Sequence, residues 1–198
     1  ELVVGTVCLL EERKGLLALV EAMPRVIQTV GDVRFVIVGE GPLKGRMQQR
    51  IAELGIADRV DFLGWRFDVP DLMSQFDVFA LASLRESFGL VYLEAMACRC
   101  PVVAARVDGV PEVVSDGETG ILVPPASPAE LARALCRVLS DEATRKRMGA
   151  AGRRRVVDLF DVRRMAAAYE ALYARLLAQP DAAAARFALP ADTGHSIK

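Results

Sequence analysis

Short apolar runs rich in β-branched residues alternate along this chain with longer amphipathic stretches, and this alternation constrains the fold most strongly. Each run is continuously apolar, which is typical of strands that are buried on both faces of a parallel sheet. The runs predict strands at residues 2–9, 33–39, 59–64, 77–82, 101–105 and 119–123. The stretches between and after them predict helices at residues 14–30, 43–55, 68–75, 89–98, 109–115 and 128–140. The sequence therefore predicts an α/β fold, with a doubly wound, Rossmann-like parallel sheet of about six strands.

The C-terminal part of the chain has a different pattern. Helical periodicity continues at residues 141–157 and 161–178, and with the helix at 128–140 it predicts a C-terminal helical layer. Residues 179–198 are rich in Ala, Pro and polar residues without periodicity, and we expect a disordered tail there. The chain opens with ELVVGTV, inside a predicted strand and without a signal peptide, so we expect a piece of a longer protein.

Composition excludes several classes of function. Lys and Arg (25) nearly balance Asp and Glu (26), whereas a nucleic-acid-binding domain would show a basic excess. The single histidine, His195, lies in the polar tail, so the body of the chain has no histidine for a Ser-His-Asp triad or a His-rich metal site. Three of the four cysteines (Cys8, Cys98, Cys100 and Cys136) fall in apolar stretches, where a small buried residue is the simplest interpretation. Their spacing fits neither a zinc site nor a disulfide framework, which favours a reducing cytosol.

Glycine and charged residues gather directly after the predicted strands. In an open α/β sheet, ligands bind at the carboxyl ends of the strands, where helix N-termini offer N–H groups to a phosphate. The residues in question are EERKG (11–15), GEGP (39–42), GWR (64–66), SLRESFG (83–89) and DGVPE (108–112). The sequence therefore predicts a site for an anionic ligand at this edge of the sheet.

Two of these segments leave alternatives open. Lys14, at a predicted helix start, is unfavourably placed for the helix dipole unless an anion lies beside it; it can otherwise be a solvent-exposed lysine. The glycines Gly39 and Gly41 either allow close approach of a ligand to the backbone or form a simple turn. They do not form the GxGxxG fingerprint and follow the second strand, so an NAD-dependent oxidoreductase is disfavoured.

RESFGLVYLEAMA (85–97) contains an acidic pair, Glu86 and Glu94. On one continuous helix these residues would lie about 12 Å apart along the axis and about 80° apart around it. Ser87 and Gly89 indicate instead that the helix starts between them, which leaves Glu86 in a loop and Glu94 near the second turn. Both carboxylates could then face one pocket, where sugar hydroxyls are suitable donors; both could also be surface glutamates.

ESFGLVYLEAMA resembles the signature of the retaining glycosyltransferases of family 4, which have the GT-B fold. Further segments occur in the order found in that family, and the resemblance covers residues 3–178. They are RKG (13–15), VIVGEGP (36–42), RVDFLGW (59–65), DVFALAS (77–83), PVVAARVDGVPEVV (101–114) and DGETGILVPP (116–125). The resemblance implies that residues 1–178 are the C-terminal, nucleotide-sugar-binding half of a GT-B enzyme. It places the acceptor-binding N-terminal domain outside this sequence.

The resemblance also implies a role for individual residues. Glu94 would accept hydrogen bonds from the ribose, Glu86 would face the donor sugar, and Lys14 would neutralise the diphosphate leaving group. We therefore predict Glu86 and Lys14 as catalytic residues. The predicted donor-binding residues are Glu94, Phe88, Gly89, Leu90, Gly39, Gly41, Trp65, Arg66 and Arg13, of which Phe88, Gly89 and Leu90 would use their backbone N–H groups.

The implied activity is transfer of a sugar, with retention, from a nucleotide diphosphate sugar to a sugar, lipid-linked glycan or small-molecule acceptor. We expect a cytoplasmic enzyme that needs no metal or other cofactor and is inactive without its N-terminal domain. The basic cluster Arg145, Lys146, Arg147, Arg153, Arg154 and Arg155 is best interpreted as a solvated helix face; peripheral membrane contact is the alternative.

Two positions depart from the pattern of the family. Leu9 stands where the family usually has an arginine that contacts the diphosphate, and Asp108 stands where glycine is commoner. Arg13 adjoins Lys14, but neighbouring side chains do not generally point the same way. Leu9 therefore indicates either a substitute cation or the alternative function of a catalytically degenerate nucleotide-sugar-binding module. Asp108 could contact the sugar or tighten a turn.

Overall fold

The computed structural model describes residues 1–178, which divide into two units: Glu1–Asp158, and the residues from Leu159 onward. The first unit is built on a sheet of six strands in the order β3-β2-β1-β4-β5-β6, and every neighbouring pair is parallel. The strands are β1 (Leu2–Val7), β2 (Val33–Val38), β3 (Val60–Gly64), β4 (Val78–Leu81), β5 (Val102–Ala105) and β6 (Gly120–Val123). The predicted doubly wound α/β fold is thus confirmed.

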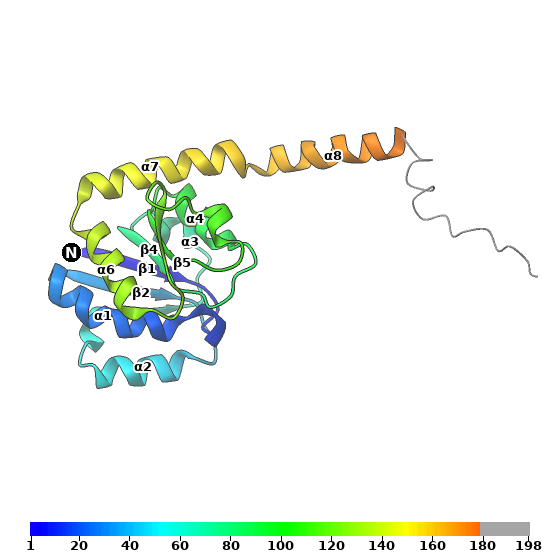
Figure 1. Ribbon diagram of the computed structural model, residues 1–198. Helices are drawn as coiled ribbons and strands as arrows, with labels where there is room; N and C mark the ends of the chain where they lie inside the picture. Colours follow the sequence, from blue (N-terminus) through cyan, green and yellow to red (C-terminus); the bar gives the residue numbers. More distant parts are fainter. Residues whose placement is uncertain (179–198) are drawn as a thin grey trace, which may run out of the picture. The chain divides into compact units, whose positions relative to one another are not determined.

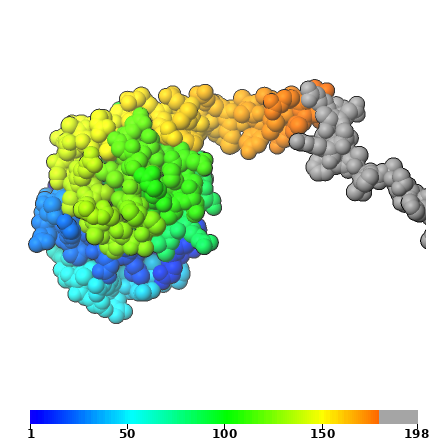
Figure 2. All heavy atoms as spheres, in the orientation of Figure 1, coloured from blue at the N-terminus to red at the C-terminus, as the bar shows by residue number. Residues whose placement is uncertain are grey.

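Continuous apolar runs become strands here because both faces of the sheet are covered. Every residue of β4 and of β5 is buried. The helices are α1 (Leu16–Val30), α2 (Lys44–Glu53), α3 (Val69–Met73), α4 (Leu90–Ala97), α5 (Val110–Val113), α6 (Pro128–Leu139) and α7 (Glu142–Leu159). Helix α1 packs against α2 and α6, while α3 packs against α4 on the other side of the strands (Figure 1). In the space-filling view, closely packed atoms of α6 and its neighbours hide the sheet from this side (Figure 2).

The order of the strands fixes where a ligand can bind. Chain connections run outward from β1 toward β3 on one side and outward from β4 toward β6 on the other, so the order reverses between β1 and β4. Helices that follow these two strands lie on opposite faces, and a crevice opens between their N-terminal loops. The loops after β1 and β4 therefore meet at the switch point of the sheet.

The first and fifth predicted helices differ from the prediction. The helix expected from residue 14 begins at Leu16, after a short 3₁₀ helix (Glu12–Lys14) and Gly15. Gly15 has a φ of +63°, and a Cβ there would lie 1.9 Å from the carbonyl oxygen of Ala82. The loop after β1 therefore breaks the helix in order to pack against the end of β4. The helix expected at residues 109–115 is the single turn α5.

The predicted C-terminal helices are all present, but they are divided between the two units. Helices α6 and α7 are present, but α8 (Val162–Ala178) belongs to the second unit. The predicted tail at residues 179–198 lies outside the described residues. No helix among residues 1–178 combines the length and the apolar character needed to cross a membrane.

Much of the basic cluster on α7 is engaged in contacts within the first unit. Arg145 forms an ion pair with Asp77, and Arg155 donates hydrogen bonds to the carbonyl oxygens of Val113 and Glu112. These contacts use the guanidinium groups to fasten α7 to other segments. They support a structural role for this part of the cluster.

The expectation of buried cysteines is only partly correct. Cys100 is buried, whereas Cys8, Cys98 and Cys136 are half-buried, and all four are free thiols. Desolvation raises the pKa of the Cys8 thiol to about 12. Cys8 follows the last residue of β1, so it brings a neutral group to the switch point at physiological pH.

Candidate functional site

Two adjoining hollows lie at the switch point and share Val7, Cys8, Leu9 and Val91. The first, of about 460 Å³, is named the cationic hollow; its other lining residues are Arg13, Lys14, Glu86, Ser87, Phe88, Gly89 and Leu90. The second, of about 380 Å³, is named the aromatic hollow; its other lining residues are Val38, Gly39, Trp65, Arg66, Val69 and Glu94. All the predicted site residues except Gly41 line one of these two hollows.

A buried ion pair forms one wall of the cationic hollow. Lys14 Nζ lies 2.5 Å from Glu86 Oε2, and each side chain is only 11% exposed. The Ser83 hydroxyl lies 3.5 Å from the same carboxylate oxygen. The alternatives of a solvent-exposed lysine and a surface glutamate at these two positions are therefore wrong.

Packing between the loops after β1 and β4 produces this pair. Lys14 ends the 3₁₀ helix, and Gly15 lies against the backbone of Ala82. The N–H of Leu84 donates a hydrogen bond of 2.7 Å to the carbonyl oxygen of Arg13. These backbone contacts bring Lys14 beside a carboxylate 72 residues away in the sequence.

Gly89 separates the two glutamates as the sequence predicts. It is the N-cap of α4 and has a φ of +84°. A Cβ at this position would lie 2.4 Å from the Tyr92 ring, so a larger residue would disturb the start of the helix. The first turn of α4 lines the cationic hollow, and a helix N-terminus there contributes partial positive charge.

Glu94 has a different environment from Glu86. It is exposed on α4 and lines the aromatic hollow beside Trp65 and Arg66. Arg66 donates two hydrogen bonds to the carboxylate of Asp68, and this contact lowers the pKa of Asp68. The guanidinium of Arg66 is therefore held in place at the rim.

The two glycines after β2 serve close packing of the backbone. Gly39 has a φ of +130°, and a Cβ there would lie 2.0 Å from the carbonyl oxygen of Cys8. A Cβ at Gly41 would lie 2.4 Å from the carbonyl oxygen of Leu10. Gly39 lines the aromatic hollow, whereas Gly41 lies outside the lining of both hollows.

Leu9 and Arg13 together show how the site differs from the expected pattern. Leu9 is 46% exposed and lines both hollows, so an apolar side chain occupies the shared wall. Arg13 lines the cationic hollow together with Lys14, although neighbouring side chains were expected to diverge. Its guanidinium also forms an ion pair with Glu11. The cationic hollow therefore has a second basic residue, which is Arg13 and not an arginine at position 9.

Sequence reasoning left Asp108 open between a sugar contact and a tight turn, and it missed the contact of Asp108 with Glu86. Asp108 lines a further hollow, of about 450 Å³, with Arg13, Leu84, Arg85, Glu86, Ser87 and Val107. Its carboxylate accepts a hydrogen bond from the backbone N–H of Glu86. The signal in the sequence was its departure from glycine, which could not indicate the partner. Ser83 was visible after a strand, but its contact with Glu86 was not.

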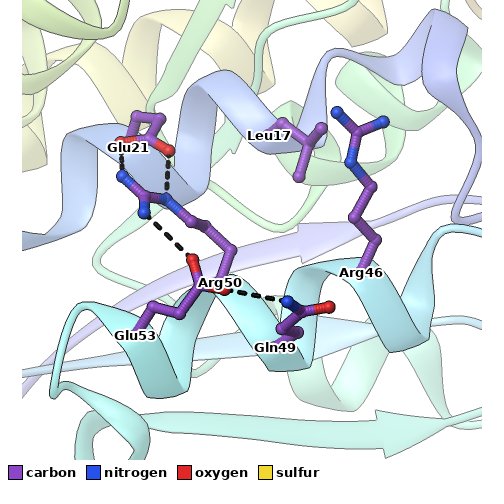
Figure 3. A pocket seen from close by; sticks show the side chains of 6 residues that line it. All are labelled: Leu17, Glu21, Arg46, Gln49, Arg50 and Glu53. Carbon is purple, nitrogen blue, oxygen red and sulfur yellow. Dashed lines mark hydrogen bonds and ion pairs between the residues drawn. The ribbon is translucent and has the colours of Figure 1, made fainter.

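A groove between α1 and α2 also collects charged side chains (Figure 3). Arg50 pairs there with Glu21 and Glu53, and Gln49 donates a hydrogen bond to Glu53. The polar groups of this groove thus largely satisfy one another on the surface of two helices. The hollows at the switch point, in contrast, hold a buried ion pair and a helix N-terminus, so they are the better candidate site.

The chemistry available at the switch point depends on cations, carboxylates and helix N–H groups. Among residues 1–178, no three His, Cys, Asp or Glu side chains are grouped in a way that could hold a metal ion. A ligand with separate anionic and hydroxyl-bearing parts would complement the cationic hollow and the two glutamates.

Proteins with named activities are similar to this chain in sequence. The chain is 37% identical over 154 residues to N-acetyl-alpha-D-glucosaminyl L-malate synthase of Bacillus anthracis, covering 78% of this chain and 40% of the relative. The chain spans about two fifths of the length of that relative and of similar ones.

Solved structures share the fold. Anabaena Alr3699/HepE, in complex with UDP and glucose, has a TM-score of 0.79 and 31% identity, over 86% of this chain and 48% of that one. The C-terminal domain of a glycosyl transferase group 1 family protein (LpcC) from Francisella tularensis has a TM-score of 0.76 and 27% identity. That match covers 81% of this chain and 87% of the Francisella domain.

The family model described as "Glycosyl transferases group 1" matches residues 1–141. This stretch contains the whole sheet and every residue of the cationic and aromatic hollows. The match spans more than half of the chain, and it agrees with the fold and with the curated relative. The chain therefore belongs to the glycosyl transferases group 1 family.

Proposed function

We propose that residues 1–178 are the donor-binding C-terminal half of a retaining, family 4 glycosyltransferase that takes its sugar from a nucleotide diphosphate. The observation that carries this proposal is the buried Lys14–Glu86 pair, which lines the cationic hollow at the switch point together with the N-terminus of α4. Membership of the glycosyl transferases group 1 family and the likeness to a protein in complex with UDP and glucose support it.

The diphosphate would bind in the cationic hollow. An ammonium group has three N–H donors, so Lys14 can keep Glu86 as a partner and still donate to a phosphate oxygen. Arg13 and the first turn of α4 would add positive charge on neighbouring sides of the same hollow. These groups are fixed by backbone packing, which is how charge that develops on a leaving group is stabilised.

The nucleoside would lie in the aromatic hollow. Glu94 is an exposed acceptor there, suited to two neighbouring hydroxyls of a ribose. Trp65 and Arg66 would mark the position of the base at the outer rim. The sugar would then lie toward Glu86, Ser87 and Asp108, on the far side of the diphosphate.

In this proposal, transfer of the sugar also requires an acceptor site that residues 1–178 do not provide. The match to an isolated C-terminal domain supports assignment of this chain to the donor half. An N-terminal domain would supply the acceptor site and close over the donor. Retention of configuration is proposed from the resemblance to family 4, and we expect transfer without a metal ion.

The variant Glu94→Ala tests the nucleoside position. Calorimetric titration with UDP and with GDP should show binding weakened by about tenfold to a hundredfold, since two charge-assisted hydrogen bonds are lost. The unfolding midpoint should not change, because Glu94 is exposed. Glu53→Ala, which alters an exposed glutamate on α2, is the matched control. Unchanged nucleotide affinity in the Glu94 variant would exclude this role.

One observation favours a second candidate function, a module that binds the donor without transferring it. Leu9 provides no charge at the wall shared by the two hollows, so the diphosphate has one cation fewer there. Turnover of nucleotide sugars by the whole protein separates the two candidates. Tight donor binding without any turnover would favour the binding module, and turnover would exclude it.

A further inference from the structure

The loop that carries Glu86 is tied to a second loop through both of its backbone polar groups. The N–H of Glu86 donates a hydrogen bond of 2.9 Å to Asp108 Oδ2. The carbonyl oxygen of Glu86 accepts one of 3.3 Å from the N–H of Gly109. The turn after β5 therefore holds the peptide from which the Glu86 side chain extends.

The backbone conformation of this turn is one that glycine would adopt more easily than Asp108. Asp108 has a φ of +41°, in the left-handed region that glycine adopts most easily. Gly109, in contrast, has an ordinary φ of −79°. Glycine is required there for lack of space, because a Cβ would lie 2.1 Å from the carbonyl oxygen of Ser87. The turn thus retains a side chain at the strained position, where glycine would relieve the strain.

We propose that Asp108 is a positioning residue that holds Glu86 in the orientation that faces the donor sugar; this inference rests on the proposed function. Glu86 is then fixed from both ends, since Lys14 and Ser83 contact its carboxylate and Asp108 anchors its backbone. Loss of the Asp108 acceptor frees the 86–88 backbone and affects the sugar side of the site. Lys14 is also held by the packing of Gly15 against Ala82, and α4 begins only after Gly89, so the diphosphate side should keep its affinity.

Two variants separate this role from a general structural one. Asp108→Gly removes the acceptor and relieves the backbone strain; these effects on stability oppose each other, so the unfolding temperature should change little. Asp108→Asn keeps an acceptor oxygen and tolerates the left-handed conformation. The probes are UDP with UDP-glucose and GDP with GDP-mannose, each titrated into the chain by calorimetry.

The expected result concerns the affinity for the nucleotide sugar relative to the nucleoside diphosphate. In Asp108→Gly this ratio should fall by about threefold to tenfold, the effect of one hydrogen bond, while the affinity for the nucleoside diphosphate is unchanged. Asp108→Asn should keep the ratio of the natural chain. An unchanged ratio in Asp108→Gly would overturn the proposal, and so would an equal loss of affinity for both ligands. An equally large fall of this ratio in Asp108→Asn would also overturn it. The asparagine keeps the acceptor for the Glu86 N–H, so such a fall would indicate direct contact of the carboxylate with the sugar.

Amide hydrogen exchange tests the same proposal without any ligand. The Glu86 amide should exchange about threefold to tenfold faster in Asp108→Gly than in the natural chain and in Asp108→Asn. Equal exchange in all three chains would overturn the positioning role. If the natural chain bound none of the probes, the proposed donor site would fail, and this measurement would still decide whether Asp108 holds Glu86.

Discussion

Two charged clusters of similar chemistry occur in this chain, and they differ in burial. Lys14 and Glu86 approach to 2.5 Å at the switch point, and Arg50 and Glu21 approach to 2.6 Å in the groove between α1 and α2. The first two side chains are each 11% exposed, whereas Arg50 and Glu21 are 40% and 39% exposed. The distance between the charges is thus nearly equal, and the access of water differs.

This difference in exposure to water decides which cluster is better suited to bind a ligand. Water can replace either partner of the groove pairs, and it screens the charges when they do meet. The switch-point pair has lost most of its water, so each charge depends on the partner or on a bound ligand. A ligand that reaches a partly desolvated cation gains more than one that reaches a fully solvated cation.

The most disruptive test is Lys14→Met, which leaves the Glu86 carboxylate buried without its cation. Breaking a buried pair from one side costs about 3–5 kcal/mol, so the midpoint of chemical or thermal unfolding should fall markedly. Urea titration followed by circular dichroism measures this loss.

The double variant Lys14→Met/Glu86→Gln provides the control for that experiment. Removal of both charges should recover much of the lost stability, since no uncompensated charge is left. A Lys14→Met chain as stable as the natural one would show that water reaches Glu86, and the contrast between the two clusters would disappear.

The same two regions can be compared by adding a positive charge to each and measuring nucleotide binding. Leu9→Arg adds a cation to the wall shared by the two hollows, and we expect nucleoside diphosphates to bind about threefold to tenfold more tightly. Leu17→Arg adds the same charge in the groove between α1 and α2 and should leave this affinity unchanged. Calorimetry on both variants makes the comparison. Equal gains would show that net charge alone, and not position at the switch point, governs binding.

The sequence predicted the parts of this molecule that depend on local pattern. Mostly apolar runs located all six strands, and in β4 and β5 the run is continuous because both faces are buried. Gly89 and Ser87 correctly placed the start of α4 between the two glutamates. The grouping of the candidate site residues around two hollows followed as well, because the carboxyl ends of parallel strands share one edge of the sheet.

Contacts between distant segments could not be predicted in this way. The Lys14–Glu86 pair joins residues 72 positions apart, and the contact of Asp108 with Glu86 joins residues 22 apart. The break before α1 depends on packing of Gly15 against Ala82, which leaves no periodic signal. Sequence pattern alone therefore left Lys14 open between an exposed lysine and a partner of an anion, and it could not indicate the buried contact with Glu86.

The smallest effect is expected for Arg50→Gln in the groove between α1 and α2. The ion pairs of Arg50 with Glu21 and Glu53 raise the pKa of its guanidinium, but the side chain is 40% exposed to solvent. Water replaces the lost partner at little cost, so the unfolding midpoint should stay within the error of the measurement. Nucleotide affinity should also be unchanged. A loss of stability comparable with that of Lys14→Met, under the same urea titration, would contradict the argument that burial decides the value of these pairs.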